Sequence, residues 1–309
     1  MRLSLAFTLT SLSLSLAACG GDDTTLTPDA ADDTGFITPT VTLKANREVS
    51  DKNWEELGDA DLSCLGKATT DVPTAAAVTL NTKVTDFQSG NAVPNATVVA
   101  FKGQDQAMMF DTGTSDGSAN VSIEIPAGVT RYGFKMTGDT SMPTLLLNQY
   151  VNPADVTGGV TTNPGKIQSV SKATAATLPA LIGQTRTDGT SVVAGALRDC
   201  QGREVSGFIA TVSTTKGSAS LITGAETYYF SSSVGLPVHH NQAQFADKDG
   251  LFMIIQLPAS QPTGYVQMWG FPTAADLAMG KDGLKLIGEL EVPLLGDTVI
   301  TGSYEPLQM

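Results

Sequence analysis

The sequence predicts an all-β protein made of two tandem β-sandwiches that are joined by a short, partly helical linker. Short runs in which apolar and polar residues alternate recur along the chain, for example at Val121, Ile123 and Ile125, and a period of two is typical of half-buried strands. Turn residues separate these runs, among them many of the 31 glycines and 15 prolines. One pattern of strand, turn and strand also occurs twice, which predicts a duplicated module.

The chain begins with a segment typical of an export signal. Arg2 supplies a positive charge, and an apolar run with Ser and Thr follows it over residues 3–16. This run is shorter than the roughly 20 apolar residues that cross a bilayer. The motif Leu16-Ala17-Ala18-Cys19 resembles the lipobox of bacterial lipoproteins. That resemblance implies that residues 1–18 are a signal peptide, that Cys19 carries acyl chains after cleavage, and that the protein is attached to a membrane by this anchor.

Two further segments precede the first module. Residues 19–35 are acidic and lack the apolar surface needed to fold, so we expect a solvated spacer. Residues 36–78 form an N-terminal extension of mixed pattern. The alternation at residues 41–44 predicts a strand, and residues 50–57 predict a short capped helix anchored by Trp54 and Leu57.

Charge and cysteine content narrow the class of protein. The formal net charge is −13, so we expect no nucleic acid among the partners. The chain has three cysteines. With Cys19 acylated, Cys64 and Cys200 remain, and outside the inner membrane thiols tend to oxidise. We therefore expect a disulfide between Cys64 and Cys200, with two unpaired thiols as the alternative that stays open.

The repeat is visible in two pairs of strings. Residues 83–96 and 196–207 each give a strand, a turn with Asp and Gly, and the start of another strand. Each copy then closes with a turn, a strand and a proline, over residues 115–128 in the first and 247–259 in the second. Gly accepts positive φ angles and Pro ends strand pairing, so the pattern indicates hairpins.

These strings resemble the carboxypeptidase regulatory-like family of transthyretin-like β-sandwiches. The resemblance covers residues 79–136 and 192–268 and implies two sandwiches of this type, which we expect to extend over residues 79–165 and 191–309. An immunoglobulin-like sandwich remains the alternative. Residues 166–190 form the linker. Its Ala and Leu pattern predicts a helix, which we expect to be one or two turns long because Pro179 lies inside it.

The second copy is longer than the first, and the inserted residues include Tyr228, Tyr229, His239 and His240. The transthyretin-like fold resembles that of intradiol dioxygenases, which hold iron with two Tyr and two His. Adjacent residues of a strand point to opposite faces, so we expect neither the tyrosines nor the histidines to converge on one ion. We expect no metal, no cofactor and no catalytic residue. A metal-dependent enzyme that uses these four residues is the remote alternative.

Two other features have competing interpretations. Asp247-Lys248-Asp249-Gly250 begins like a calcium loop, but a strand follows where further ligands are needed, which favours a turn. Trp269 and Tyr265 alternate with Gln267 on one strand face, so they form either core or an exposed surface on which sugars stack. The string Gly113-Thr114-Ser115-Asp116-Gly117 has the G-x-S-x-G spacing, but an alternating strand pattern follows it, so we expect a hairpin turn and no catalytic serine. No H-E-x-x-H motif occurs in the sequence.

We therefore expect a non-enzymatic, lipid-anchored protein of the bacterial cell envelope that acts as a binding or structural β-sandwich module. Gly20 after the acylated residue is compatible with the outer membrane, facing the periplasm or the cell surface. The expected partners are envelope proteins or glycans. The alternative is a carbohydrate- or small-ligand-binding module on the second sandwich, with a candidate surface formed by Tyr228, Tyr229, His239, His240 and Trp269.

Overall fold

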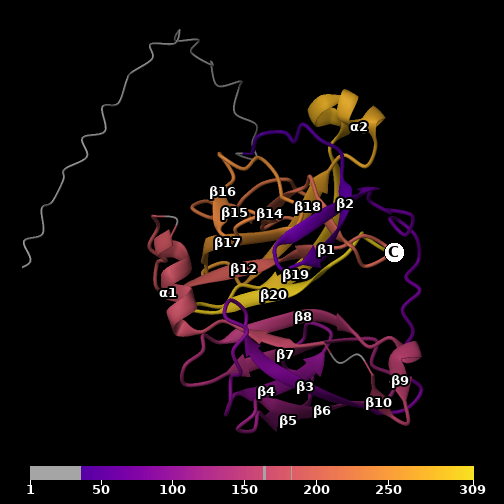
Figure 1. Cartoon of the computed structure of the whole chain (residues 1–309), viewed down its shortest axis with the longest axis vertical. Coiled ribbons are helices and arrows are strands. Elements are labelled where there is room, and N and C mark those ends of the chain that lie inside the picture. Colours follow the sequence, from indigo (N-terminus) through magenta and orange to yellow (C-terminus); the bar gives the residue numbers. More distant parts are fainter. Residues whose placement is uncertain (1–35, 163–164, 182) are drawn as a thin grey trace, which may run out of the picture. The chain divides into compact units, whose positions relative to one another are not determined.

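The computed structural model describes residues 36–162, 165–181 and 183–309. These residues form two β-sandwich modules, as the sequence predicted (Figure 1). The first module contains β3 (Val78–Asp86), β4 (Thr97–Lys102), β5 (Met109–Thr114), β6 (Asn120–Ile125), β7 (Arg131–Thr137), β8 (Thr144–Tyr150), the 3₁₀ turn η1 (Pro153–Asp155), β9 (Val156–Thr157), β10 (Val160–Thr161) and β11 (Ile167–Ser169). The second contains β12 (Thr190–Leu197), β13 (Glu204–Ser206), β14 (Ile209–Ser213), β15 (Glu226–Phe230), β16 (Pro237–His239), β17 (Leu251–Pro258), β18 (Thr263–Gly270), α2 (Ala274–Ala278), η2 (Gly280–Gly283), β19 (Lys285–Pro293) and β20 (Val299–Tyr304).

The two modules repeat the same strand pairing. In the first module β3 pairs antiparallel with β6 and parallel with β11, and in the second β12 pairs antiparallel with β17 and parallel with β20. On the facing sheets β4 pairs with β7 and β7 with β8, as β14 pairs with β18 and β18 with β19. The repeat found in the sequence is therefore also a repeat of topology.

The turns before β6 and β17 show how the repeat is built. The N–H of Ala119 donates to the carbonyl of Asp116, and the N–H of Gly250 donates to the carbonyl of Asp247. Ala119 and Gly250 have φ angles of 65° and 64°, the left-handed region. At Gly250 an added Cβ would lie 2.8 Å from the carbonyl oxygen of Val205. Only glycine fits this position without displacing β13.

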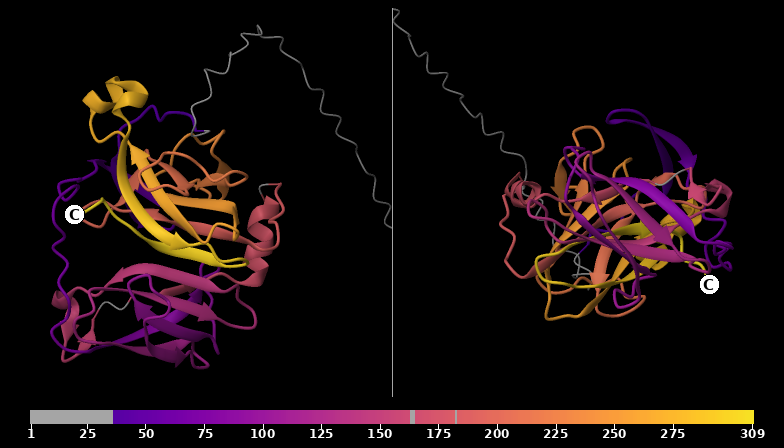
Figure 2. Two further views of the ribbon diagram at one scale, coloured as in Figure 1. Left: turned by 180° about the vertical axis from the view of Figure 1, so that it is seen from behind. Right: turned by 90° about the horizontal axis from the view of Figure 1, so that it is seen from below.

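One sheet runs through both modules. Its nine strands lie in the order β16-β15-β17-β12-β20-β8-β7-β4-β5. The junction is a parallel pairing between β8 of the first module and β20 of the second, with Leu145 opposite Ile300 (Figures 1 and 2). The sequence predicted that a linker alone joins the two sandwiches. The structure shows in addition that backbone hydrogen bonds fuse them.

Each half of the nine-stranded sheet has its own covering layer. The sheet that contains β3, β6 and β11 encloses the core of the first module against β4 and β7. The sheet β14-β18-β19 encloses the core of the second module. On β8 these cores meet, because Leu145 and Leu147 belong to the second core and Leu146 packs against the first. Successive side chains of β8 point to opposite faces of the sheet, so this one strand contributes to both cores.

The linker contains a longer helix than the sequence predicted. Helix α1 (Lys172–Leu181) has 10 residues. Its first turn is capped by Ser171, whose hydroxyl accepts a hydrogen bond from the N–H of Thr174 at 3.0 Å. The expectation of one or two turns was wrong because Pro179 lies in the last turn, where it removes only one internal hydrogen bond from the helix.

The N-terminal extension forms a hairpin of β1 (Lys44–Ser50) and β2 (Asn53–Asp59), which pairs with β13. The predicted strand over 41–44 begins only at Lys44, and the predicted helix over 50–57 is wrong. Lys52 has a φ angle of 55°, so the chain reverses there instead of continuing as a helix. An ion pair between Arg47 and Glu55, 2.6 Å apart, joins the two strands.

A disulfide joins the extension to the second module. Cys64 and Cys200 are bonded, with 5.8 Å between their Cα atoms and a sequence separation of 136. This is the pairing expected from the cysteine count. The same segment is held by hydrogen bonds, because the N–H of Cys200 donates to the carbonyl of Asp61 at 2.9 Å.

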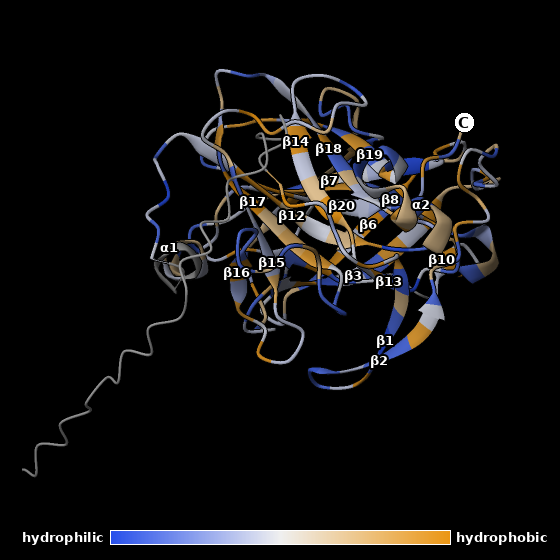
Figure 3. Cartoon of the chain, turned by 90° about the horizontal axis from the view of Figure 1, so that it is seen from above, coloured by the Kyte–Doolittle hydropathy of each residue, from blue (hydrophilic) through white to orange (hydrophobic). Residues whose placement is uncertain are grey.

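In the view of the chain from above (Figure 3), β17 is largely in the hydrophobic colours and the turn of the β1–β2 hairpin largely in hydrophilic ones. No helix in the described part of the chain is both long enough and apolar enough to span a bilayer.

Candidate functional site

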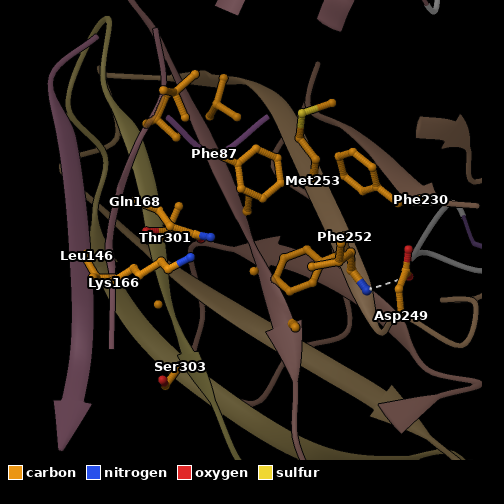
Figure 4. Close-up of a pocket in the computed structure, with 18 of the residues that line it drawn as sticks. Phe87, Leu146, Lys166, Gln168, Phe230, Asp249, Phe252, Met253, Thr301 and Ser303 are labelled. Atoms are coloured by element: carbon orange, nitrogen blue, oxygen red, sulfur yellow. Dashed lines mark hydrogen bonds between the residues drawn. The ribbon is translucent and has the colours of Figure 1, made fainter. Parts of the chain in front are cut away.

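A groove of about 640 Å³ lies on the face of the nine-stranded sheet that β14-β18-β19 leaves uncovered in the second module (Figure 4). It arises because one of two packed sheets is narrower than the other. The covering sheet of the first module ends at β11, while the nine-stranded sheet continues beneath it through β20, β12, β17 and β15. The volume falls within the range of roughly 300 to 1,000 Å³ that is typical of small-molecule sites.

The floor of the groove carries small side chains. Ala194 and Ala196 on β12 and Thr301 and Ser303 on β20 line it. Their neighbours on these strands, among them Val193, lie in the core on the opposite face. Because the side chains on the floor are short, the groove is deep enough to hold a ligand.

Apolar side chains of larger size form the walls. Phe230 and Met253 rise from β15 and β17, and Phe87 comes from the loop after β3 (Figure 4). The rings of Phe87 and Phe230 meet edge to face with centroids 6.4 Å apart. Met142 and Leu146 of the first module complete this wall. Both modules therefore contribute to the groove.

Half of the charged side chains that line the groove are held in ion pairs. Arg198 lies 3.4 Å from Glu204, and Arg186 lies 2.9 Å from Asp297. Lys166 is exposed at the rim, across the pocket from Asp249 in Figure 4. The groove therefore offers an apolar interior with a small number of polar groups, the composition common to ligand sites.

Asp249 is the buried carboxyl group of the groove, with 5% of the residue exposed. Burial raises its pKa to about 7, and the nearby Asp247 adds to this effect, while backbone N–H groups oppose it. One of these donors is the N–H of Leu251, 3.0 Å from Oδ1. No side chain of the described residues donates a hydrogen bond to this carboxyl group.

The segment around Asp249 is a turn, as the sequence favoured. Asp247 accepts hydrogen bonds from the N–H and hydroxyl of Ser232 at 2.9 and 2.8 Å through Oδ2. Among the described residues no group of three or more His, Cys, Asp and Glu side chains is arranged to hold a metal ion.

Tyr228 and Tyr229 lie on opposite faces of β15, as strand alternation predicts. Tyr229 is fully buried in the second core, and its hydroxyl accepts a hydrogen bond from the N–H of Ala210 at 3.0 Å. Tyr228 packs on the other face with Phe230 and Met253. Its hydroxyl donates to Glu226 Oε2 at 3.1 Å. Burial raises the pKa of both tyrosines.

The two histidines lie side by side, which corrects the expectation that they point to opposite faces. Their ring centroids are 4.3 Å apart, because β16 ends at His239 and the alternation of the strand stops there. His239 lies 3.1 Å from Glu226 and packs against the ring of Tyr228. His240 packs against Phe36. Burial and the neighbouring His239 lower the pKa of His240 to about 4, against a smaller opposing effect of Glu226.

Trp269 belongs to a different part of the second module. Val266 and Met268 of β18 lie in the core, so Tyr265, Gln267 and Trp269 lie on the outer face of β14-β18-β19. Gln267 is nonetheless buried. Its side-chain amide group is satisfied there by hydrogen bonds that it donates to Glu289 at 2.8 Å and to the carbonyl of Thr215 at 3.2 Å. The five residues of the candidate surface therefore occupy three environments: Tyr229 in the core, Trp269 on this outer face, and Tyr228 with the histidines at the β15–β16 edge.

The groove residues were not singled out as a site from the sequence, apart from Asp249 as part of a turn. A signal was present in the small residues Ala194, Ala196, Thr301 and Ser303, which alternate along two strands. Without the pairing of β20 with β8 and β12, however, these residues indicate no common surface. Cys19, the expected lipidation site, lies outside the described residues.

Comparison with known proteins gives only distant similarities. No family model matches the sequence. No curated protein matches it either. Among solved structures, the TIE protein of Bacillus anthracis is 12% identical with a TM-score of 0.23, and the match covers 74% of this chain and 34% of that one. The shaft pilin SpaA of Lactobacillus rhamnosus GG is 11% identical with a TM-score of 0.21, covering 76% of this chain and 99% of that one.

The chain thus spans about a third of the length of the TIE protein. Similarity at this level carries no argument about function. What the structure itself establishes is an all-β protein of two sandwich modules that share one sheet and that together line an apolar groove.

Proposed function

We propose that this protein is a non-enzymatic, lipid-anchored component of the bacterial cell envelope that binds a small, largely apolar ligand in the groove between its modules. Acyl chains on Cys19 hold it in the outer membrane, and the acidic spacer of residues 19–35 gives the folded part reach from the bilayer. Two or three acyl chains make a stable anchor, since each buried CH₂ contributes about 0.8 kcal/mol.

The observation that carries the binding function is the groove of about 640 Å³ lined by Phe87, Phe230 and Met253 over a floor of small residues. A sheet face of this kind is normally covered by a second layer, because apolar side chains exposed to water cost free energy. Here the layer stops at β11 and the linker helix. Phe230 and Met253 are already buried, so an apolar ligand would chiefly cover the half-buried Phe87, Ala194 and Ala196.

The arrangement of polar groups favours binding over catalysis. Neither His239 nor His240 lines the groove, so no imidazole is placed to serve there as a general base. The arginines at its ends are held by Glu204 and Asp297. The two ion pairs fix the shape of the groove and make its ends polar, which is the usual role of polar residues in an apolar ligand site.

Tryptophan fluorescence provides a direct test, because Trp54 lines the groove and Trp269 does not. In a Trp269→Phe variant, Trp54 is the remaining tryptophan of the chain. Titration with octan-1-ol is expected to change its emission in a saturable manner. An Ala194→Phe variant, which fills the floor, should weaken this binding at least tenfold, whereas Thr112→Phe on the exposed edge strand β5 should not.

A linear, non-saturating response in the wild-type groove would count against the proposal. So would equal affinities of the Ala194→Phe and Thr112→Phe variants. The melting temperature of each variant shows whether it is folded, so a loss of binding by unfolding is recognised.

A further inference from the structure

A carboxyl group without a counter-ion lies in the wall of the groove. Only 5% of Asp249 is exposed. Among the described residues, the groups that donate hydrogen bonds to its carboxyl group are backbone N–H groups. The charged form of such a group is costly in an apolar site unless a cation or several donors meet it. The carboxylate of Asp249 therefore lacks a cationic partner that a bound ligand could supply.

The turn that contains Asp249 does not explain this residue. The turn is closed by the hydrogen bond from Gly250 to the carbonyl of Asp247, and the side chain of Asp247 fixes the neighbouring loop at Ser232. The first module supplies an internal comparison. There the equivalent turn runs from Asp116 to Ala119, and the position that corresponds to Asp249 is the exposed Ser118. The same turn therefore forms without a carboxyl group at this position.

The surroundings of Asp249 suit a positively charged group. Phe230 and Phe87 line the same groove, whereas the ring of Phe252 lies in the second core against Phe208 and Tyr304. Faces of aromatic rings attract cations, and an ammonium group donates strong, charge-assisted hydrogen bonds to a carboxylate. An anionic ligand finds fewer partners, since Arg198 and Arg186 are already paired with Glu204 and Asp297, and the remaining cation of the lining, Lys166, is exposed at the rim.

We propose that the groove selects a ligand with an apolar body and a terminal ammonium group, and that Asp249 receives this ammonium group. The inference rests on the proposed function, because it requires the groove to be a binding site. It adds the chemical class of the ligand, an amphipathic amine. The chain length that fits is set by the groove, and an eight-carbon amine is a suitable probe.

Isothermal titration calorimetry at pH 8 with three probes of equal chain length tests the inference. Octylammonium, octan-1-ol and octanoate share the apolar body and differ in the charge of the end group. At pH 8 an alkylammonium with a pKa near that of lysine, about 10.4, is protonated. We expect the wild-type protein to bind octylammonium at least tenfold more tightly than octan-1-ol, and octanoate more weakly than either.

Two variants locate the effect. Asp249→Asn should reduce the affinity for octylammonium about tenfold while changing the affinity for octan-1-ol by less than twofold. Glu48→Gln, which removes an exposed carboxylate at the rim of the same groove, should leave the preference for the amine unchanged. The unchanged binding of octan-1-ol by the Asp249→Asn variant also shows that the groove remains folded.

The outcomes separate the two proposals. If none of the three probes binds, the groove is not a ligand site and both proposals are wrong. If all three bind with similar affinity, or if the preference for octylammonium persists in Asp249→Asn, the groove is a ligand site but the inference about its ligand is overturned.

Discussion

The carboxylate of Asp199 accepts a hydrogen bond from the backbone N–H of Asp61 at 3.1 Å. The first module has a counterpart, since Asp86 accepts a hydrogen bond from the N–H of Ser171 at 2.9 Å. Asp86 and Asp199 occupy the same place in the repeat, at the end of β3 and just after the end of β12. In each module this aspartate holds a segment from outside the repeat: the N-terminal extension in one case, the start of the linker helix in the other.

Replacing Asp199 with Asn should destabilise the protein by about 2 to 4 kcal/mol, because the side chain is fully buried and paired with Arg203 at 2.5 Å. The pKa of Asp199 is lowered in the folded state by Arg203 and the backbone donors, which outweigh desolvation. Urea denaturation at pH 7 measures the change. A loss below about 0.5 kcal/mol would show that the ion pair and the contact with Asp61 contribute little.

The disulfide is expected to add to this attachment. In the chain-entropy model, closing a loop as long as the one between Cys64 and Cys200 contributes roughly 4 to 5 kcal/mol. The double variant Cys64→Ser/Cys200→Ser should therefore have a lower urea midpoint than the wild type. The wild-type protein should move to the same midpoint when it is reduced with dithiothreitol. If reduction leaves the midpoint unchanged, the bridge does not contribute to stability.

The raised pKa of Asp249 predicts a dependence of stability on pH. The pKa of Asp249 is about 7 in the folded protein, and the ordinary pKa of an aspartate is 3.8, so between these values the folded state binds more protons than the unfolded state. The free energy of unfolding then falls as the pH rises through this range.

Asp249→Asn removes that dependence. At pH 8 the variant should be more stable than the wild type by up to about 4 kcal/mol, and at pH 4 the two should be nearly equal. Thermal or urea unfolding at the two pH values measures the difference. A variant that is less stable than the wild type at pH 8 would mean that the ionised carboxyl has a partner that stabilises it.

His240 predicts a dependence of opposite sign. Its pKa is lowered to about 4 by burial and by His239, so the unfolded state takes up a proton first as the pH falls below 6.5. Stability from this residue is complete above pH 6.5 and is lost as the pH falls towards 4. Glu226, Phe36 and His239 are the neighbours that face it.

A His240→Phe variant should lose less stability than the wild type between pH 7 and pH 4.5, because no buried imidazole has to be charged. Urea midpoints at the two pH values give the comparison, and each protein serves as its own reference at pH 7. Equal losses in the wild type and the variant would show that His240 takes no part in acid sensitivity.

The anchor predicts a change of location. In a bacterium that processes lipoproteins, Cys19→Ser should fail to incorporate labelled palmitate and should appear in the soluble fraction. Cys64→Ser, which leaves Cys19 in place, is the control and should remain with the membrane. Retention of the Cys19→Ser protein in the membrane fraction would contradict the lipid anchor.

The sequence predicted the local parts of the fold well. The alternation of Val121, Ile123 and Ile125 predicted β6, and the repeated Asp and Gly turns predicted two modules of similar topology. These predictions succeeded because strand period and turn chemistry are encoded by neighbouring residues. The same reasoning failed for residues 50–57, where capping signals suggested a helix and a cross-strand ion pair of Arg47 with Glu55 supports a hairpin instead.

The groove was beyond such reasoning. It exists because β8 and β20 pair, which places Leu145 beside Ile300 across more than half of the chain. The sequence near β20 predicts a strand but not its partner, since one apolar strand pairs with another without a local signal. The candidate residues of the insertion were misjudged for a related reason: the end of β16 at His239, a matter of strand length, decides that the histidines lie together.

The central claim is that an amphipathic amine binds in the groove on the shared sheet, and methionine methyl groups test it most directly by NMR. Met142 and Met253 line the groove, whereas Met136 and Met268 are buried in the cores of the first and second modules. With ¹³C-methyl methionine, titration of the protein with octylammonium is predicted to shift the signals of Met142 and Met253 and to leave those of Met136 and Met268 in place. Unshifted signals of Met142 and Met253 at saturating amine would contradict the account.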